Sequence, residues 1–215
     1  MNQILGVGLS PFVRKVLLCC DYKGIEYENL LIMPGDESED FRRISPLGKV
    51  PAFKDDYVEL CDSSVIFDYL EGKYPQPALL PSSPQDRARA LWFEEFADSA
   101  LIPHLGAGMF FEKLVGPAMR GTTCNPAVVA AAEEAMKPLQ DYLEQQLHGE
   151  FLVGGAMSIA DLSVASVFLN ASFADYEVDA SHWPKLSAYL KALWGSDLFK
   201  PHIEADHAML AAFQG

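Results

Sequence analysis

The chain has little positive charge and no apolar run long enough to cross a membrane. Among 215 residues, 16 Lys and Arg stand against 30 Asp and Glu, and the net charge is −14. This balance disfavours nucleic acid or an anionic membrane surface as a partner. Charges such as Asp21 and Lys23 interrupt each apolar stretch before it reaches spanning length. Residues 1–5 also lack the basic and apolar regions of a signal peptide. We therefore expect a soluble, cytoplasmic protein.

Cysteine is scarce as well. The four cysteines, Cys19, Cys20, Cys61 and Cys124, form neither a Cys-x-x-Cys pair nor a cluster with metal-ligand spacing. Cys19 and Cys20 end an apolar run, where a small buried thiol is the expected state. A reactive thiol needs an exposed, electropositive setting such as a helix N-terminus. The position that offers one holds Ser10, so we expect neither a metal site nor thiol–disulfide chemistry.

Hydrophobic and proline residues indicate two folded domains. Half of the chain is hydrophobic and 11% is aromatic, which is sufficient for substantial cores. Prolines at 75, 77, 81 and 84 mark the best candidate linker. We therefore predict a domain over 1–77, a linker over 78–85 and a second domain over 86–215.

The predicted elements differ between these two domains. In the first, short strands are expected at 2–7, 27–33, 52–54 and 57–60, helices at 11–23 and 64–72, and a short helix or an irregular turn at 38–44. With a helix at 38–44 the order is β-α-β-α-β-β-α. The second domain is predicted to be all-helical, with helices at 85–113, 126–148, 159–173, 184–194 and 199–212. Ser158 and Asp161 have the spacing of a capping box at the start of one of them.

Three separated turns carry the functional signal. Ser10 precedes Pro11 at a predicted helix N-terminus, whose unpaired N–H groups favour an anion such as a thiolate. Val50-Pro51 offers backbone groups that could pair with an extended ligand. Asp62 could bind an ammonium group, and Ser63, with the N–H groups of the next helix, a carboxylate. A ligand with one ammonium, two carboxylates and a thiol fits this set, and glutathione is such a ligand.

Over its whole length the chain resembles the glutathione transferase family. The resemblance is carried by S-P-F-V-R-K-V from Ser10, by L-G-K-V-P from Leu47 and by D-S-S-V-I-F-D-Y-L from Asp62, although Glu is commoner than Asp at position 62. It is strongest to the serine-type, bacterial or plant-like branches. It implies an α/β thioredoxin-like N-terminal domain, an all-α C-terminal domain, a cytoplasmic homodimer and glutathione as co-substrate.

The resemblance also implies roles for individual residues. Ser10 would be the catalytic residue, donating a hydrogen bond that stabilises the glutathione thiolate. Glutathione would be bound by Lys49, Val50, Pro51, Asp62 and Ser63. The resemblance also implies a cis Val50–Pro51 peptide bond, although most X–Pro bonds are trans. Each role has a simpler alternative, because Ser10, Asp62 and Ser63 could be ordinary helix caps and Lys49 a solvated lysine. The spacing of the three turns favours the functional interpretation.

The second substrate would be a small apolar electrophile. Its candidate pocket residues are Phe12, Leu105, Met109 and Phe110, although an apolar stripe of this kind is usually core. Glutathione-dependent peroxidase, isomerase or dehalogenase activity on the same fold stays open, as does a non-catalytic binding or regulatory role. The Ser-Ser-Cys signature of the zeta-type isomerases is absent, which weighs against that activity.

Overall fold

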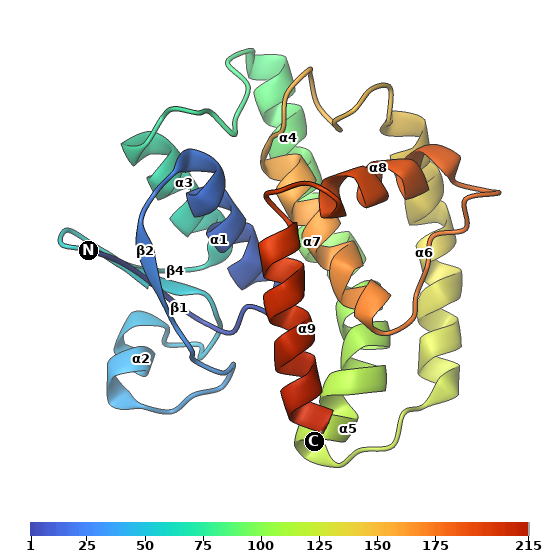
Figure 1. The fold of residues 1–215 in the computed structure, drawn as a ribbon, viewed down its shortest axis with the longest axis horizontal. Helices are drawn as coiled ribbons and strands as arrows, with labels where there is room; N and C mark the ends of the chain where they lie inside the picture. The colour runs from blue at the N-terminus through green and yellow to red at the C-terminus, as the bar shows by residue number, and fades with distance from the viewer. Residues whose placement is uncertain (215) are drawn as a thin grey trace. The chain divides into compact units, whose positions relative to one another are not determined.

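The computed structural model describes residues 1–214 and divides into two compact units, Met1–Leu80 and Pro81–Gly215 (Figure 1). The first unit is a four-stranded mixed sheet with helices, and the second is helical throughout. This confirms the predicted fold class, a thioredoxin-like α/β domain followed by an all-α domain. None of the described helices is both long and apolar enough to cross a bilayer.

The sheet of the first unit has the strand order β2-β1-β3-β4. Strand β1 (Asn2–Leu5) pairs in parallel with β2 (Tyr27–Leu30) and antiparallel with β3 (Ala52–Lys54), which pairs antiparallel with β4 (Glu59–Cys61). The parallel pair needs a crossover, and α1 (Pro11–Lys23) supplies it. In Figure 1, α1 and α3 (Ser63–Lys73) lie together on one side of the sheet, and α2 (Glu39–Ile44) lies on the other.

The buried carboxylate of Asp55 links the turn between β3 and β4 to α3 by hydrogen bonds. Asp55 accepts hydrogen bonds from the Tyr69 hydroxyl (2.6 Å) and the Lys73 ammonium (2.5 Å), and from the N–H groups of Tyr57 and Val58. Burial would raise the pKa of Asp55, but these hydrogen bonds outweigh it and hold the pKa well below its usual range. The carboxylate thus fixes α3 against the strand that precedes it.

The first unit extends to Leu80 because a buried ion pair holds the segment after α3. The Lys23 ammonium lies 2.6 Å from a Glu71 oxygen and donates to the carbonyls of Tyr74 and Pro77. Glu71 in turn accepts from the N–H groups of Leu79 and Leu80, whose side chains are buried. Leu79 and Leu80, two of the residues proposed as linker, are therefore packed onto the first unit.

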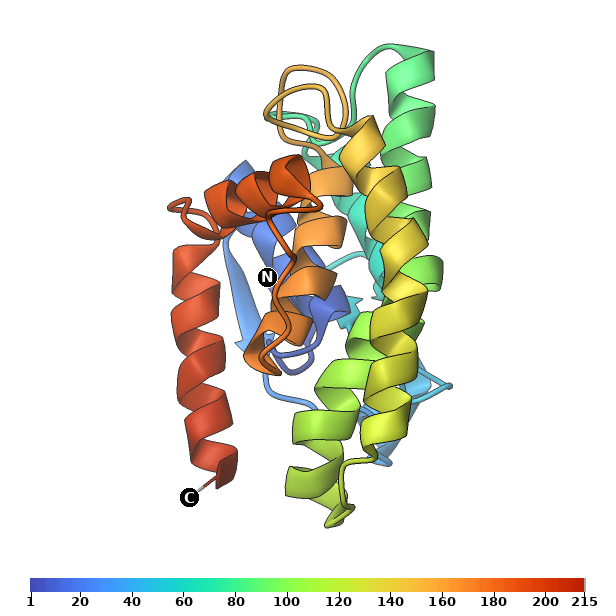
Figure 2. The same cartoon turned by 90° about the vertical axis from the view of Figure 1, so that its right-hand side faces the viewer.

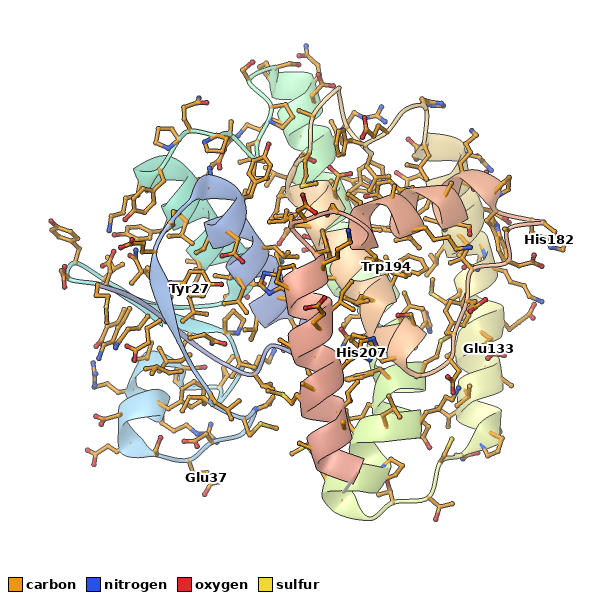
Figure 3. The ribbon with its side chains drawn as sticks, viewed as in Figure 1. Tyr27, Glu37, Glu133, His182, Trp194 and His207 are labelled. Carbon is orange, nitrogen blue, oxygen red and sulfur yellow. The ribbon has the colours of Figure 1, made fainter. Side chains whose placement is uncertain are left out.

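The second unit surrounds one buried helix, α7 (Ile159–Phe173), in which every residue from Ile159 to Ala171 is buried. Its neighbours include α4 (Pro84–Phe96), η1 (Ala97–Val115) and α8 (Pro184–Trp194). The indole N–H of Trp194, labelled in Figure 3, donates to the Ala165 carbonyl at 3.1 Å. Figure 2 shows α6 (Pro126–Gln146) running alongside η1; α5 (Gly116–Arg120) and α9 (Lys200–Gln214) complete the unit.

The long helix predicted over 85–113 is continuous in space but changes its winding. After α4 the chain continues as η1, a π-helix that contains Pro103, and then as α5. Proline has no N–H to donate, so a regular α-helical ladder cannot pass through Pro103. At the end of η1 the Gly116 N–H donates to the carbonyl of Phe111, five residues earlier, which is π-helical spacing. The amphipathic period predicted the helix but not this change in its geometry.

The start of α7 is stabilised by Asp161, whose side chain is completely buried. One carboxylate oxygen accepts from the Leu152 N–H (2.9 Å) and the Tyr189 hydroxyl (2.8 Å). The other accepts from the N–H (2.8 Å) and hydroxyl (3.0 Å) of Ser158. The predicted capping box is confirmed. Burial raises the pKa of Asp161, and the four hydrogen bonds act in the opposite direction.

Replacing this carboxylate should destabilise the fold. Asp161→Asn puts an NH₂ group where two donors already point, so we expect the free energy of unfolding to fall by about 1.5–3 kcal/mol. Denaturant unfolding measures the change, and Asp197→Asn, at a fully exposed side chain, is the matched control. Equal unfolding midpoints for Asp161→Asn and the native protein would contradict this account.

Candidate functional site

The register of the sheet brings the three predicted turns to one edge. Leu5 at the end of β1 pairs with Ala52 at the start of β3, and Ala52 pairs with Cys61 at the end of β4. The chain that leads to Ser10 leaves after Leu5, Val50-Pro51 enters before Ala52, and Asp62-Ser63 follows Cys61. Paired strands lie about 4.8 Å apart, so the three turns emerge side by side.

Gly6 allows two of these turns to approach each other closely. A Cβ atom at Gly6 would lie 2.5 Å from a methyl carbon of Val13 and 3.2 Å from the Cβ of Val50. Any side chain here would therefore collide with α1 and press against the turn before β3. The absence of a side chain at position 6 keeps Val50 close to the first turns of α1.

Ser10 is the N-cap residue of α1, but its hydroxyl does not cap the helix. Its carbonyl accepts from the Arg14 N–H at 2.9 Å, and the side chain makes no cap hydrogen bond. The first turn of α1 holds no acidic residue, so the partial positive charge of this helix end is not offset from within the helix. Such a helix end favours a bound anion.

The turn before β3 is braced from within the first unit. The buried Ser45 hydroxyl donates to the Lys49 carbonyl (2.7 Å) and accepts from the Lys49 N–H (3.1 Å). The Lys49 side chain is exposed, Val50 and Pro51 are buried, and the Val50–Pro51 bond is cis as predicted. A second cis bond, Gln76–Pro77, was not predicted. The sequence analysis missed Ser45, for which Ser-Pro after a short helix gives only a turn signal.

Asp62 fills part of the N-terminus of α3 with its own carboxylate. Its Oδ1 atom accepts from the N–H groups of Ser64 (3.0 Å) and Val65 (3.3 Å), and its backbone has φ 79°. Asp and Asn are the side-chain-bearing residues that best tolerate positive φ. Two of the N–H groups expected to receive a ligand carboxylate are therefore already paired. Ser63, which is buried, is left as the residue of this turn that could meet such a carboxylate.

The predicted pocket residues lie in two different units. Phe12 is half-buried on α1, with the Lys15 ammonium 5.9 Å from its ring centre. Leu105, Met109 and Phe110 are buried on η1. That helix packs closely on α6, since a Cβ at Gly108 would lie 2.6 Å from the Cβ of Ala132. A role for the four residues in one apolar pocket stays a prediction.

The two cysteine thiols of α1 are unsuited to act as nucleophiles. Burial raises the pKa of Cys19 to about 12, and it also raises the pKa of Cys20. Both side chains are completely buried. Within residues 1–214, no group of three His, Cys, Asp or Glu side chains is placed to hold a metal ion. The thiols of Cys19 and Cys20 are therefore poor candidates for a nucleophile at this site.

A Ser, His and Asp cluster elsewhere lacks the geometry of a nucleophile relay. In the loop before α8, the Ser181 hydroxyl (3.2 Å) and an Asp179 oxygen (2.9 Å) both contact the same ring nitrogen, Nδ1, of His182. A relay needs the two partners on opposite ring nitrogens. Figure 3 shows His182 on the outer rim of the helical unit. This cluster is an exposed turn rather than a second site.

Comparison with known proteins agrees with the fold. The glutathione S-transferase N-terminal domain model matches residues 5–78, and the C-terminal domain model matches residues 122–192. Rat maleylacetoacetate isomerase is 31% identical over 191 residues, covering 86% of this chain and 84% of that protein. Glutathione S-transferase T1 of Arabidopsis thaliana is 30% identical over 215 residues, covering 94% and 86%. The chain belongs to the glutathione S-transferase family.

Solved structures show the same architecture. Human glutathione S-transferase T1-1 in its apo form superposes with a TM-score of 0.83 at 27% identity, covering 95% of this chain and 89% of that one. A glutathione S-transferase from Rhodospirillum rubrum gives 0.85 at 22% identity, which supports the fold alone. The match extends through both units of the chain.

The capping role of Asp62 predicts an order of stability among variants. Asp62→Ala removes the acceptor and keeps an unfavourable φ, so the free energy of unfolding should fall by about 0.5–2 kcal/mol. Asp62→Asn keeps an acceptor oxygen and should lose less. Denaturant unfolding measures both, with Asp56→Asn as the control at an exposed acid of the same unit. An alanine variant as stable as the asparagine variant would show that the cap does not stabilise α3.

Proposed function

We propose that this chain is a glutathione transferase that activates the glutathione thiol for attack on a small apolar electrophile. The observation that carries the proposal is the register Leu5–Ala52–Cys61, which places three chemically different turns at one sheet edge. Membership of the glutathione S-transferase family indicates glutathione as the co-substrate. The three turns supply groups that can bind its thiol, its backbone and its charged ends. Glutathione is a consumed co-substrate here, not a resident cofactor.

Ser10 is proposed as the catalytic residue. Its hydroxyl, which is not used to cap α1, donates a hydrogen bond to the glutathione sulfur and favours the thiolate over the thiol. The α1 N-terminus, whose first turn holds no acidic residue, adds positive potential to the same effect. Ser10 itself neither attacks the electrophile nor takes the thiol proton, which leaves to solvent.

The other turns are proposed to hold the rest of the tripeptide. The Val50 backbone, next to Pro51, pairs with the cysteinyl residue, and Lys49 contacts the glycyl carboxylate. Ser63 binds the γ-glutamyl carboxylate through its N–H and hydroxyl groups. Asp62 uses Oδ1 for the α3 cap, so Oδ2 is the oxygen proposed to meet the ammonium group. Asp62 thus combines a structural and a binding role.

The reaction forms one carbon–sulfur bond. The thiolate sulfur attacks the electrophilic carbon, and either a leaving group departs with its electron pair or a proton from solvent completes a conjugate addition. Phe12, Leu105, Met109 and Phe110 are proposed to favour an apolar electrophile. We also place the protein in the cytoplasm.

Maleylacetoacetate isomerisation is the second candidate, because the rat enzyme of that name is 31% identical to this chain. Two features favour conjugation over it. Position 10 is flanked by Leu9, Pro11 and Phe12, so the Ser-Ser-Cys signature is absent. The nearby thiols of Cys19 and Cys20 are buried and have raised pKa values. Peroxidase and dehalogenase activities are further outcomes of the same assay panel.

The proposal predicts that millimolar glutathione stabilises the protein thermally and that Ser10→Ala lowers turnover with a panel of apolar electrophiles. Loss of one hydrogen bond to a charged sulfur costs about 1.5–3 kcal/mol, so turnover should fall roughly 10- to 150-fold. The pH at which bound glutathione ionises should rise, while its affinity changes little. Thermal denaturation, turnover and thiolate absorbance measure these quantities.

Ser38→Ala is the control, since Ser38 is exposed and bonds only locally to Asp36. Absence of glutathione stabilisation in the native protein would refute the proposed function. If the thiolate titration in Ser10→Ala is unchanged, Ser10 has no catalytic role and serves only as the N-cap residue of α1. Turnover of maleylacetoacetate but of no electrophile in the panel would favour the isomerase.

We also propose a homodimer, which both units support with exposed apolar side chains. Tyr57 and Val65 are 81% and 49% exposed in the first unit, and Leu91 and Trp92 are 40% and 50% exposed in the second. Exposed apolar side chains such as these are ones that a subunit interface would cover. Sedimentation at micromolar concentration should give twice the 23.7 kDa chain mass. Tyr57→Ser should weaken association more than Leu31→Ser, and a native monomer would contradict the proposal.

A further inference from the structure

The Ser45 hydroxyl makes an unusual pair of contacts with one residue of the turn before β3. It donates to the Lys49 carbonyl at 2.7 Å and accepts from the Lys49 N–H at 3.1 Å. Ser45 is itself 1% exposed, so water does not compete for these bonds. Both peptide groups that flank the Lys49 Cα are therefore held by a single buried oxygen.

This arrangement fixes the direction of a neighbouring donor. The Lys49 carbonyl and the Val50 N–H belong to the same planar peptide group. The Lys49–Val50 bond is trans, so its C=O and N–H point in opposite directions. Because the carbonyl is held toward Ser45, the Val50 N–H points away from Ser45. Rotation of this peptide would break the 2.7 Å bond.

A second set of contacts holds the same turn. The Gly48 N–H donates to the Ser45 carbonyl (2.8 Å), and the Gly48 carbonyl accepts from the Gly35 N–H (2.8 Å). Gly48 has φ 65°, and a Cβ atom there would lie 2.6 Å from an Arg42 guanidinium nitrogen. The Arg42 guanidinium also donates to the Pro46 carbonyl. Residues 45–49 thus form a rigid turn that ends at the Val50 N–H.

We propose that Ser45 is a positioning residue for glutathione, aiming the Val50 N–H at the carbonyl of the cysteinyl residue. This inference rests on the proposed function. Ser45 does not touch the ligand: it acts through the Lys49–Val50 peptide. Its contribution is to binding and not to thiolate formation, because the sulfur is assigned to Ser10 on a different turn.

The test compares Ser45→Ala with Ser45→Thr, which keeps a hydroxyl, and with Ser38→Ala, the same truncation at an exposed serine of the first unit. In Ser45→Ala, the Kd for glutathione should rise about three- to tenfold, the effect of weakening one neutral hydrogen bond. The turnover at saturating glutathione and the pH of thiolate formation should stay at native values. Ser45→Thr should restore part of the affinity, and Ser38→Ala should match the native protein.

A shorter ligand separates the Val50 N–H from the Lys49 side chain. γ-Glutamylcysteine amide lacks the glycyl carboxylate proposed for Lys49 but keeps the cysteinyl carbonyl oxygen as part of a neutral amide. If Ser45 acts through the Val50 N–H, Ser45→Ala should weaken the binding of γ-glutamylcysteine amide by the same factor as that of glutathione. If the variant instead displaces the Lys49 side chain, its defect should vanish with the shorter ligand, and the proposal would be overturned.

Backbone amide NMR gives a readout that needs no activity. The Val50 amide signal should shift on addition of glutathione to the native protein, and in Ser45→Ala the shift should need higher ligand concentrations. Gly48→Ala, which perturbs the same turn from the Arg42 side, should act in the same direction if Ser45→Ala proves too unstable to study.

A native protein that binds no glutathione would refute the proposed function and this inference together. Native-like affinity in Ser45→Ala, with glutathione bound normally by the native protein, would refute the inference alone.

Discussion

The pairing of Leu5 with Ala52 and of Ala52 with Cys61 is the constraint on which the candidate site depends. A shift of one residue in either pair would turn buried side chains of β3 to the opposite face of the sheet. Ala52 and Phe53 are completely buried, so such a shift would be costly. The register that the cores enforce is therefore also the register that brings the three turns together. Folding energy and site geometry have the same origin here, and the site needs no separate device to bring its turns together.

The two helix ends at this edge are used differently. The N-terminus of α1 has no acidic residue in its first turn, and Ser10 does not cap it with its side chain. The N-terminus of α3 is partly neutralised by Asp62, which takes up two of its N–H groups. Positive potential is thus concentrated where a thiolate is proposed to lie, and reduced where an ammonium and a carboxylate are proposed to lie together. The same structural element, a helix start, is adapted to two ligand chemistries by the presence or absence of one carboxylate.

The sequence predicted the fold well because its signals were local. Helix starts at Pro11, Ile159 and Pro184, and the capping box of Ser158 and Asp161, follow from residues that are neighbours in the chain. Contacts between distant residues were not predictable in the same way. Glu71, paired with Lys23, holds Leu79 and Leu80 to the first unit, and Gly6 fits between Val13 and Val50. Ser45 was missed for a related reason: a serine before a proline indicates a turn, but not which peptide its hydroxyl will hold.

The net charge of −14 is a poor guide to a site that is proposed to bind an anion. At physiological ionic strength, exposed charges are screened beyond about 8 Å, so most of the surface acids do not act on the three turns. The oriented N–H groups at the start of α1 lie next to the proposed sulfur position, and they add positive potential without changing the net charge at all. No acidic residue lies in the first turn of α1 to offset them. A fixed helix end can therefore favour a thiolate in a chain whose overall charge is strongly negative.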